Sequence, residues 1–165
     1  MSVKVKVIDK NPKAFDKYSK SFQIQLKRTL GKAGMMVRNT AVQSILSGGK
    51  SGKVYEKYNP RRTHRSSGEG QAPASDTGFL ASNIVLSKIN EQEMSIEVES
   101  RAEYSQFLEF GTQNMKARPF MFPALEENKP KIRRMFKQTR GKAKWVCILK
   151  IYKLQYLILY QMTAH

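Results

Sequence analysis

The sequence predicts an α+β fold in which a long N-terminal helix and a C-terminal helix pack on a small antiparallel sheet. Three patterns lead to this prediction. Apolar residues recur every three or four positions over residues 12–46, and a second such pattern covers residues 120–138. Apolar and polar residues alternate at residues 3–8 and again between residues 84 and 100. Residues 47–75 are rich in Gly and basic side chains, and we expect them to form a long flexible basic loop.

The first element is a strand. Val3, Val5 and Val7 alternate with Lys4 and Lys6. This alternation indicates a strand with one buried face and one basic face. Exposed lysines of this kind are typical of protected sheet edges.

The long helix that follows is expected to bury one stripe of apolar side chains. Its members are Phe15, Tyr18, Phe22, Leu26, Leu30, Ala33, Val37, Ala41 and Ile45. Further along, Asp76 is placed to cap a short helix at residues 79–83. Residues 84–88 and 94–100 then read as an antiparallel hairpin. The C-terminal helix contains Pro130, which predicts a kink or two separate helices.

The charge of the chain predicts attraction to polyanions. It has 30 Lys and Arg against 13 acidic residues, a formal net charge of +17. Six cations gather in the loop and are candidates to face DNA or a partner protein: Lys50, Lys53, Lys57, Arg61, Arg62 and Arg65. Tyr55 and Tyr58 lie among them, a mixture that suits a nucleic-acid backbone. A solvated loop is an equal alternative, and residues 53–59 and 63–66 weakly indicate strands.

The centre of the chain is acidic. Residues 69–110 hold eight acids, Glu69, Asp76, Glu91, Glu93, Glu97, Glu99, Glu103 and Glu109, against Lys88 and Arg101. Separated charge of this kind allows copies to pair head to tail. Alternatively, the acidic strands lie beside basic elements of the same subunit.

No pattern for catalysis or metal binding is present, so we expect no enzyme activity, no cofactor and no metal. The two histidines, His64 and His165, lie in the loop and at the C-terminus, and Cys147 is the single cysteine. Glu103 and Glu109 resemble an acid pair, but we interpret them as part of a solvated helical face.

A dense apolar block lies at residues 102–125. Tyr104, Phe107, Leu108 and Phe110 recur at helical spacing, and Gly111 follows where a helix can end at positive φ. We expect these aromatic residues, together with Phe120, to form a packed core.

Two groups of residues in the chain point to a family. The first is Tyr104, Phe107, Glu109, Phe110, Gly111, Thr112, Ala117, Arg118, Pro119, Phe120, Pro123, Ala124 and Leu125. The second is Ala72, Pro73, Asp76, Thr77, Gly78 and Leu80. Together they resemble the gene-ten-like morphogenesis family of tailed bacteriophages, which are head–tail joining or tail-completion components. The resemblance covers residues 1–138, which we treat as one domain, and implies that the basic segment is an extended hairpin or flexible loop.

The resemblance implies a structural subunit of the virion neck, forming a ring between the capsid connector and the tail. Its partners would be other neck, connector and tail proteins, and copies of itself, although a free subunit can stay monomeric. DNA would pass through the lumen without sequence-specific contacts, no membrane is involved, and assembly would take place in the host cytoplasm. The alternative is a non-specific nucleic-acid-binding protein that uses residues 47–67.

The C-terminal stretch departs from the family. Residues 139–165 form an extension that is first basic and then apolar and aromatic. An interfacial helix, an extra strand and a subunit contact all remain open for it.

Overall fold

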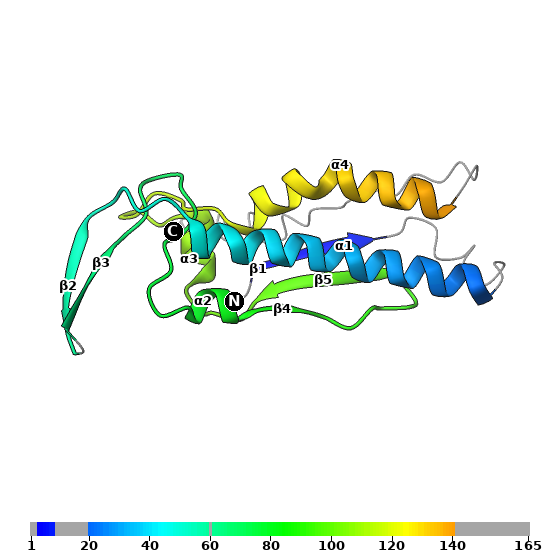
Figure 1. Ribbon diagram of the computed structural model, residues 1–165, viewed down its shortest axis with the longest axis horizontal. Helices are drawn as coiled ribbons and strands as arrows, with labels where there is room; N and C mark the ends of the chain where they lie inside the picture. The colour runs from blue at the N-terminus through cyan, green and yellow to red at the C-terminus, as the bar shows by residue number, and fades with distance from the viewer. Residues whose placement is uncertain (1–2, 9–19, 60, 141–165) are drawn as a thin grey trace, which may run out of the picture.

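The computed structural model describes residues 3–8, 20–59 and 61–140. Its elements are β1 (Val3–Ile8), α1 (Lys20–Ser47), β2 (Val54–Tyr58), β3 (Arg61–Arg65), α2 (Phe79–Ser82), β4 (Ile84–Leu86), β5 (Ser95–Ser100), α3 (Ser105–Phe110) and α4 (Met121–Arg140). The α+β prediction is confirmed: a long N-terminal helix and a C-terminal helix lie against a small antiparallel sheet (Figure 1).

The main sheet has three antiparallel strands in the order β1-β5-β4. Val98 in the central strand lies opposite Val5 on one side and Leu86 on the other, and these apolar residues line the face toward the helices. The alternate residues face away, where Lys4 pairs with Glu99 at 3.3 Å. Because β1 is an edge strand, the predicted protected edge is confirmed.

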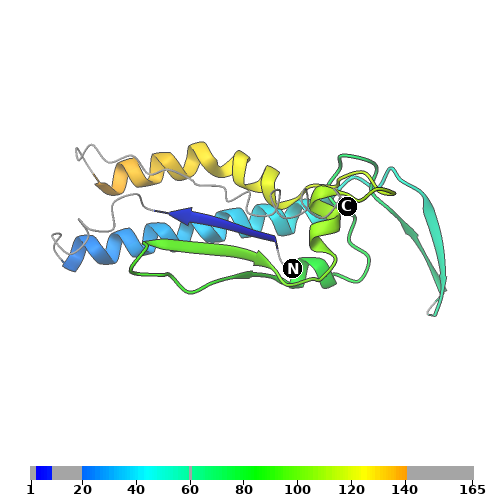
Figure 2. The ribbon, with the colours of Figure 1, turned by 180° about the vertical axis from the view of Figure 1, so that it is seen from behind.

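The two long helices lie side by side over the sheet (Figures 1 and 2). The predicted stripe of α1 is buried at Leu26, Leu30, Ala33, Val37, Ala41 and Ile45. Phe22 is half-buried, whereas Phe15 and Tyr18 lie outside the described residues. Burial of this face explains why a helix of 28 residues forms despite its two internal glycines.

Helix α4 continues through Pro130 as one helix of 20 residues, so of the two predicted alternatives the division into two separate helices is wrong. Pro130 is exposed, so the carbonyl that loses its N–H partner lies on the solvent side of the helix. On the opposite side Ile132 and Phe136 are fully buried against the core. Tertiary packing therefore outweighs the local cost of proline, about 3 kcal/mol.

Strands β2 and β3 form a separate two-stranded antiparallel sheet, here called the arm. The arm projects from one end of the body, beyond the C-terminal end of α1 (Figures 1 and 2). Both weakly indicated strands are thus present in the segment expected to be a loop. Of the predicted C-terminal extension, residues 139–165, the first two residues belong to α4 and residues 141–165 lie outside the described residues.

Candidate functional site

Glu109 organises the end of the body from which the arm projects. Its side chain is buried, at 5% exposure, and its carboxylate accepts three backbone hydrogen bonds. One oxygen accepts from the N–H groups of Phe120 and Met121 at 2.9 and 3.0 Å, and the other accepts from Phe122 at 2.8 Å. These N–H groups belong to the first turn of α4, where no intrahelical acceptor exists. Glu109 therefore caps a helix that begins twelve residues later, at Met121, and its assignment to a solvated face was wrong.

The segment between α3 and α4 turns back tightly to make this cap. Gly111 has φ of 79°, which confirms the predicted positive φ at the end of α3. Thr112 and Met115 exchange backbone hydrogen bonds, and Arg118 N–H donates to the Leu108 carbonyl at 2.7 Å. The half-buried Pro119 precedes the fully buried Phe120, and Pro123 lies in the first turn of α4, where an N–H is not needed.

The aromatic side chains of α3 are not core, contrary to the prediction. Tyr104, Phe107 and Phe110 are 42%, 48% and 43% exposed. Phe79 of α2 is 52% exposed, and its ring centroid lies 6.3 Å from that of Tyr104. We call these four residues the aromatic strip. In α3 the residues that face the core are Ser105 and Glu109. The capping carboxylate is therefore buried on the side where the apolar periodicity predicted the aromatic rings.

Asp76 holds the arm to the body. Its carboxylate pairs with Lys57, with Arg62 at 3.1 Å and with His64 at 3.7 Å. The hydrogen bond from Lys57, helped by the positive charge of Arg62, holds the pKa of the Asp76 carboxyl below its usual range. The predicted cap of α2 by Asp76 is wrong, since α2 begins after Gly78 without a side-chain cap.

The six candidate cations of the arm region divide into two sets. Lys57 and Arg62 lie opposite each other on the face that meets Asp76, and both pair with its carboxylate, which compensates part of their charge. The other four, Lys50, Lys53, Arg61 and Arg65, are exposed and form no ion pair within residues 3–8, 20–59 and 61–140. Of the six, this second set is therefore the one whose charge no acidic side chain of the described residues compensates.

The acidic centre is largely neutralised inside the same chain. Glu91 pairs with Lys27, Glu93 and Glu97 pair with Lys6, Glu99 pairs with Lys4, and Glu69 pairs with Lys116. These contacts support acidic strands lying beside basic elements of one subunit. They leave little separated charge for head-to-tail pairing of copies.

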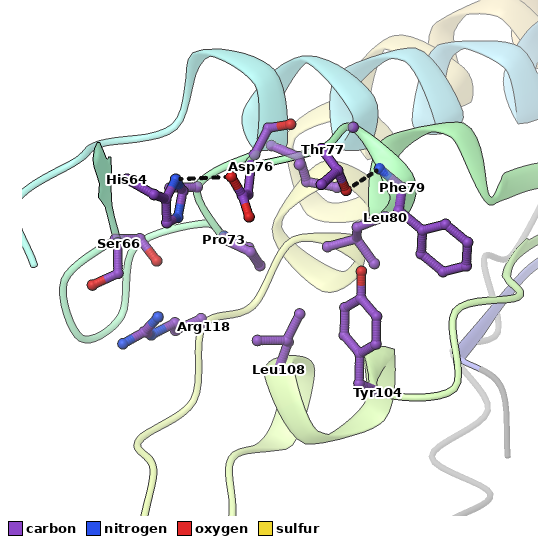
Figure 3. A pocket seen from close by; sticks show the side chains of 15 residues that line it. His64, Ser66, Pro73, Asp76, Thr77, Phe79, Leu80, Tyr104, Leu108 and Arg118 are labelled. Atoms are coloured by element: carbon purple, nitrogen blue, oxygen red, sulfur yellow. Dashed lines mark hydrogen bonds and ion pairs between the residues drawn. The ribbon is translucent and has the colours of Figure 1, made fainter. Parts of the chain in front are cut away.

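A partly open cavity of about 250 Å³ lies between the base of the arm and the aromatic strip (Figure 3). His64 and Ser66 border it on the arm side, and Leu80, Tyr104 and Leu108 border it on the opposite side. Arg118 points from the segment before α4 toward the arm side. Asp76, Tyr104 and Arg118 belong to the sequence motifs described above, but the sequence did not indicate that all three line one cavity.

Metal and membrane features can be checked over the same part of the chain. No group of three or more His, Cys, Asp or Glu side chains among the described residues is arranged to hold a metal ion. None of the described helices combines the length and apolar character needed to cross a membrane.

Comparison with protein families gives one match. Residues 9–111, more than half of the chain, match the family described as "Bacteriophage HK97-gp10, putative tail-component". The matched segment includes α1, the arm, strands β4 and β5 of the main sheet and α3, and it ends at Gly111, whereas β1 and α4 lie outside it. No curated protein and no solved structure matches the chain significantly.

Proposed function

Because this chain belongs to the HK97-gp10-like family of bacteriophage tail components, we propose that it is a structural subunit of the virion neck. In this proposal it completes a ring between the capsid connector and the tail, and the arm is the element that contacts the neighbouring subunit or ring.

The arm is the observation that carries the proposal. Residues alternate across its two strands, and the face turned away from Asp76 carries Val54, Glu56, Tyr58, Arg61, Thr63 and Arg65, all exposed. Val54 and Tyr58 are 54% and 78% exposed. An isolated two-stranded hairpin is only marginally stable in water. An arm that leaves one face and two strand edges uncovered is therefore suited to be stabilised by another protein.

Protein is favoured over DNA as the partner by the composition of this outer face. Val54 and Tyr58, at the two ends of β2, add exposed apolar area to this face, which stabilises a protein interface but contributes little to phosphate binding. The aromatic strip adds further exposed apolar area at the same end of the molecule. Both surfaces fit a subunit that makes more than one contact in an assembly.

The second candidate function is non-specific binding of DNA through residues 47–67. It is favoured by the four exposed cations without acidic partners in the described chain, Lys50, Lys53, Arg61 and Arg65. Cations placed in this way can bind phosphates through counterion release, without reading sequence. Tyr55 and Tyr58 provide rings on which single-stranded bases can stack.

The double variant Arg61→Ser with Arg65→Ser tests the two functions. It changes only the outer face of the arm, whereas Arg62 is left in place because it pairs with Asp76. The matched control is Arg133→Ser with Arg134→Ser, which removes the same charge from exposed positions on α4. Joining of heads to tails is measured by in vitro complementation, and affinity for duplex DNA is measured at fixed salt.

We expect the arm variant to lose joining activity while its DNA affinity changes no more than that of the control. Normal joining with reduced DNA affinity would support the DNA-binding function and contradict the assembly role of the arm. If both activities match the control, the outer face of the arm is a solvated surface and neither function is correct.

A further inference from the structure

Two exposed surfaces lie at the end of the body from which the arm projects. The first is the outer face of the arm, where Arg61 and Arg65 have no acidic partner in the described chain. The second is the aromatic strip of α2 and α3 (Figure 1). Apolar area gathered in this way on a protein surface marks a contact with another protein. Each of the two surfaces therefore needs a partner that covers it.

The arm does not place its outer face on the aromatic strip of its own chain. Lys57 and Arg62, on the inner face, pair with the carboxylate of Asp76. Asp76 belongs to the segment directly before α2, so the body that carries the strip meets the inner face of the arm. Successive side chains of a strand point to opposite sides. The outer face therefore points away from its own body and is open to a second molecule.

The arm and the strip carry groups that attract each other. On the arm, Arg65 lies directly opposite Val54, and Arg61 lies directly opposite Tyr58, so each guanidinium stands beside an apolar side chain. On the strip, the faces of the aromatic rings attract cations and their edges accept apolar contacts. Arginine and aromatic side chains are the residue types that protein interfaces favour.

Glu103 adds a negative charge to the strip. It is exposed, directly precedes Tyr104 and lies four residues, one helical turn, before Phe107. Within the described residues it forms no ion pair, and this includes its neighbour Arg101. An arginine that another molecule brings to the strip therefore meets rings and an uncompensated carboxylate, with which a guanidinium can form two hydrogen bonds.

The two surfaces also agree in length. Val54 and Tyr58 are four residues apart in an extended strand, a distance of about 13 Å. Helix α3 rises by about 9 Å between Tyr104 and Phe110. The ring of Phe79 adds to the strip beside Tyr104, at 6.3 Å between the centroids. Both ends of the outer face, each with one arginine and one apolar residue, can therefore meet a ring at the same time.

A second copy of the chain is the partner that covers both surfaces in every subunit. When the arm of one copy meets the strip of the next, one free arm and one free strip remain, so the same contact repeats until a ring closes. A strip-to-strip contact would stop at two copies and would leave both arms uncovered. The arm-to-strip contact does not use the acidic strands, whose charge is compensated within the chain.

We propose that the outer face of the arm docks on the aromatic strip of a neighbouring copy. Arg61 and Arg65 lie against the rings, one of them pairs with Glu103, and Val54 and Tyr58 pack on the aromatic side chains. The inference rests on the proposed function, because it names the partner of the arm within the ring.

Charge reversal with rescue tests the contact in the in vitro complementation assay of head–tail joining. Arg61→Glu with Arg65→Glu places acids against Glu103 and is expected to lower the joined fraction by about tenfold or more. Adding Glu103→Arg to the same chain restores attraction at every contact and is expected to raise the joined fraction again by about threefold or more. The matched control adds Glu127→Arg instead, at an exposed position on α4, and is expected to restore nothing.

Phe107→Ala tests the aromatic part of the contact. Because Phe107 is 48% exposed, the melting temperature of the free chain is expected to change little. The joined fraction is expected to fall by about fivefold or more, as for a central aromatic residue of an interface. The matched control is Ile24→Ala on α1, which is 51% exposed and is expected to join normally.

The outcomes separate this inference from the proposed function. If the arm variant loses joining and Glu103→Arg restores no more than Glu127→Arg does, the arm contacts a different protein, so the inference is wrong while the assembly role of the arm stands. Normal joining by Phe107→Ala would likewise show that the strip is not the docking surface. If the arm variant itself joins normally, the proposed function of the arm fails, and the inference fails with it.

Discussion

Replacing Glu109 by Gln tests the capping interaction that joins α3 to α4. The carboxylate accepts from Phe120 and Met121 with one oxygen and from Phe122 with the other. Glutamine keeps one acceptor oxygen, so two hydrogen bonds can be retained, while its NH₂ group faces the third N–H donor. The orphaned buried N–H costs about 1–3 kcal/mol. Loss of the negative charge at the helix N-terminus adds about 0.3–2 kcal/mol.

We therefore expect Glu109→Gln to lower the free energy of unfolding by about 1–5 kcal/mol, measured by urea denaturation. The amide protons of Phe120, Met121 and Phe122 are also expected to lose protection from hydrogen exchange. The control is Glu103→Gln, at an exposed position just before α3, which is expected to change stability by less than about 0.5 kcal/mol. A Glu109→Gln effect as small as that of the control would refute the capping argument.

Three further predictions concern the same end of the molecule. Phe120→Ala should lower the free energy of unfolding by about 3–5 kcal/mol because the Phe120 ring is fully buried. Phe110→Ala should lower it by less than about 1 kcal/mol, since Phe110 is 43% exposed. Equal shifts of the melting temperature for the two variants would contradict this prediction. Gly111→Ala places a Cβ 2.7 Å from a backbone oxygen at a residue of positive φ, and should lower the free energy of unfolding by about 2 kcal/mol or more. Gly31→Ala is the control, because open space surrounds Gly31 and alanine there should stabilise α1. Thermal denaturation measures both effects. The lowered pKa of Asp76 means that its stabilising contribution is present above the pKa of the unfolded chain and is lost as pH falls through the lower folded value. The protection factors of the arm amides, which correct for the intrinsic exchange rate at each pH, should therefore fall below about pH 4. An Asp76→Asn variant that protects the arm at pH 7 as well as the native chain does would refute the anchoring role.

The order and type of the elements could be predicted from the sequence because they depend on local periodicity. The buried stripe of α1 from Leu26 to Ile45 and the alternation of Val3, Val5 and Val7 are each visible in a short window. Gly111 was correctly expected at positive φ because a glycine after the last apolar residue of a helix has few other roles. The residues on which the family resemblance rests also lie close together in sequence.

Contacts between distant residues were decided only by the tertiary structure. Glu109 lies among exposed aromatic side chains, so the local sequence pattern assigned it to a solvated face. Asp76 precedes a short helix, so the local pattern assigned it to the cap of that helix. In the fold the Glu109 carboxylate accepts hydrogen bonds at the N-terminus of α4, and the Asp76 carboxylate pairs with Lys57 and Arg62 of the arm. A buried carboxylate needs donors, and a sequence window does not show which donors the chain brings to it. Hydrophobic periodicity therefore determined the elements here, whereas the satisfaction of buried polar groups determined how their ends are joined.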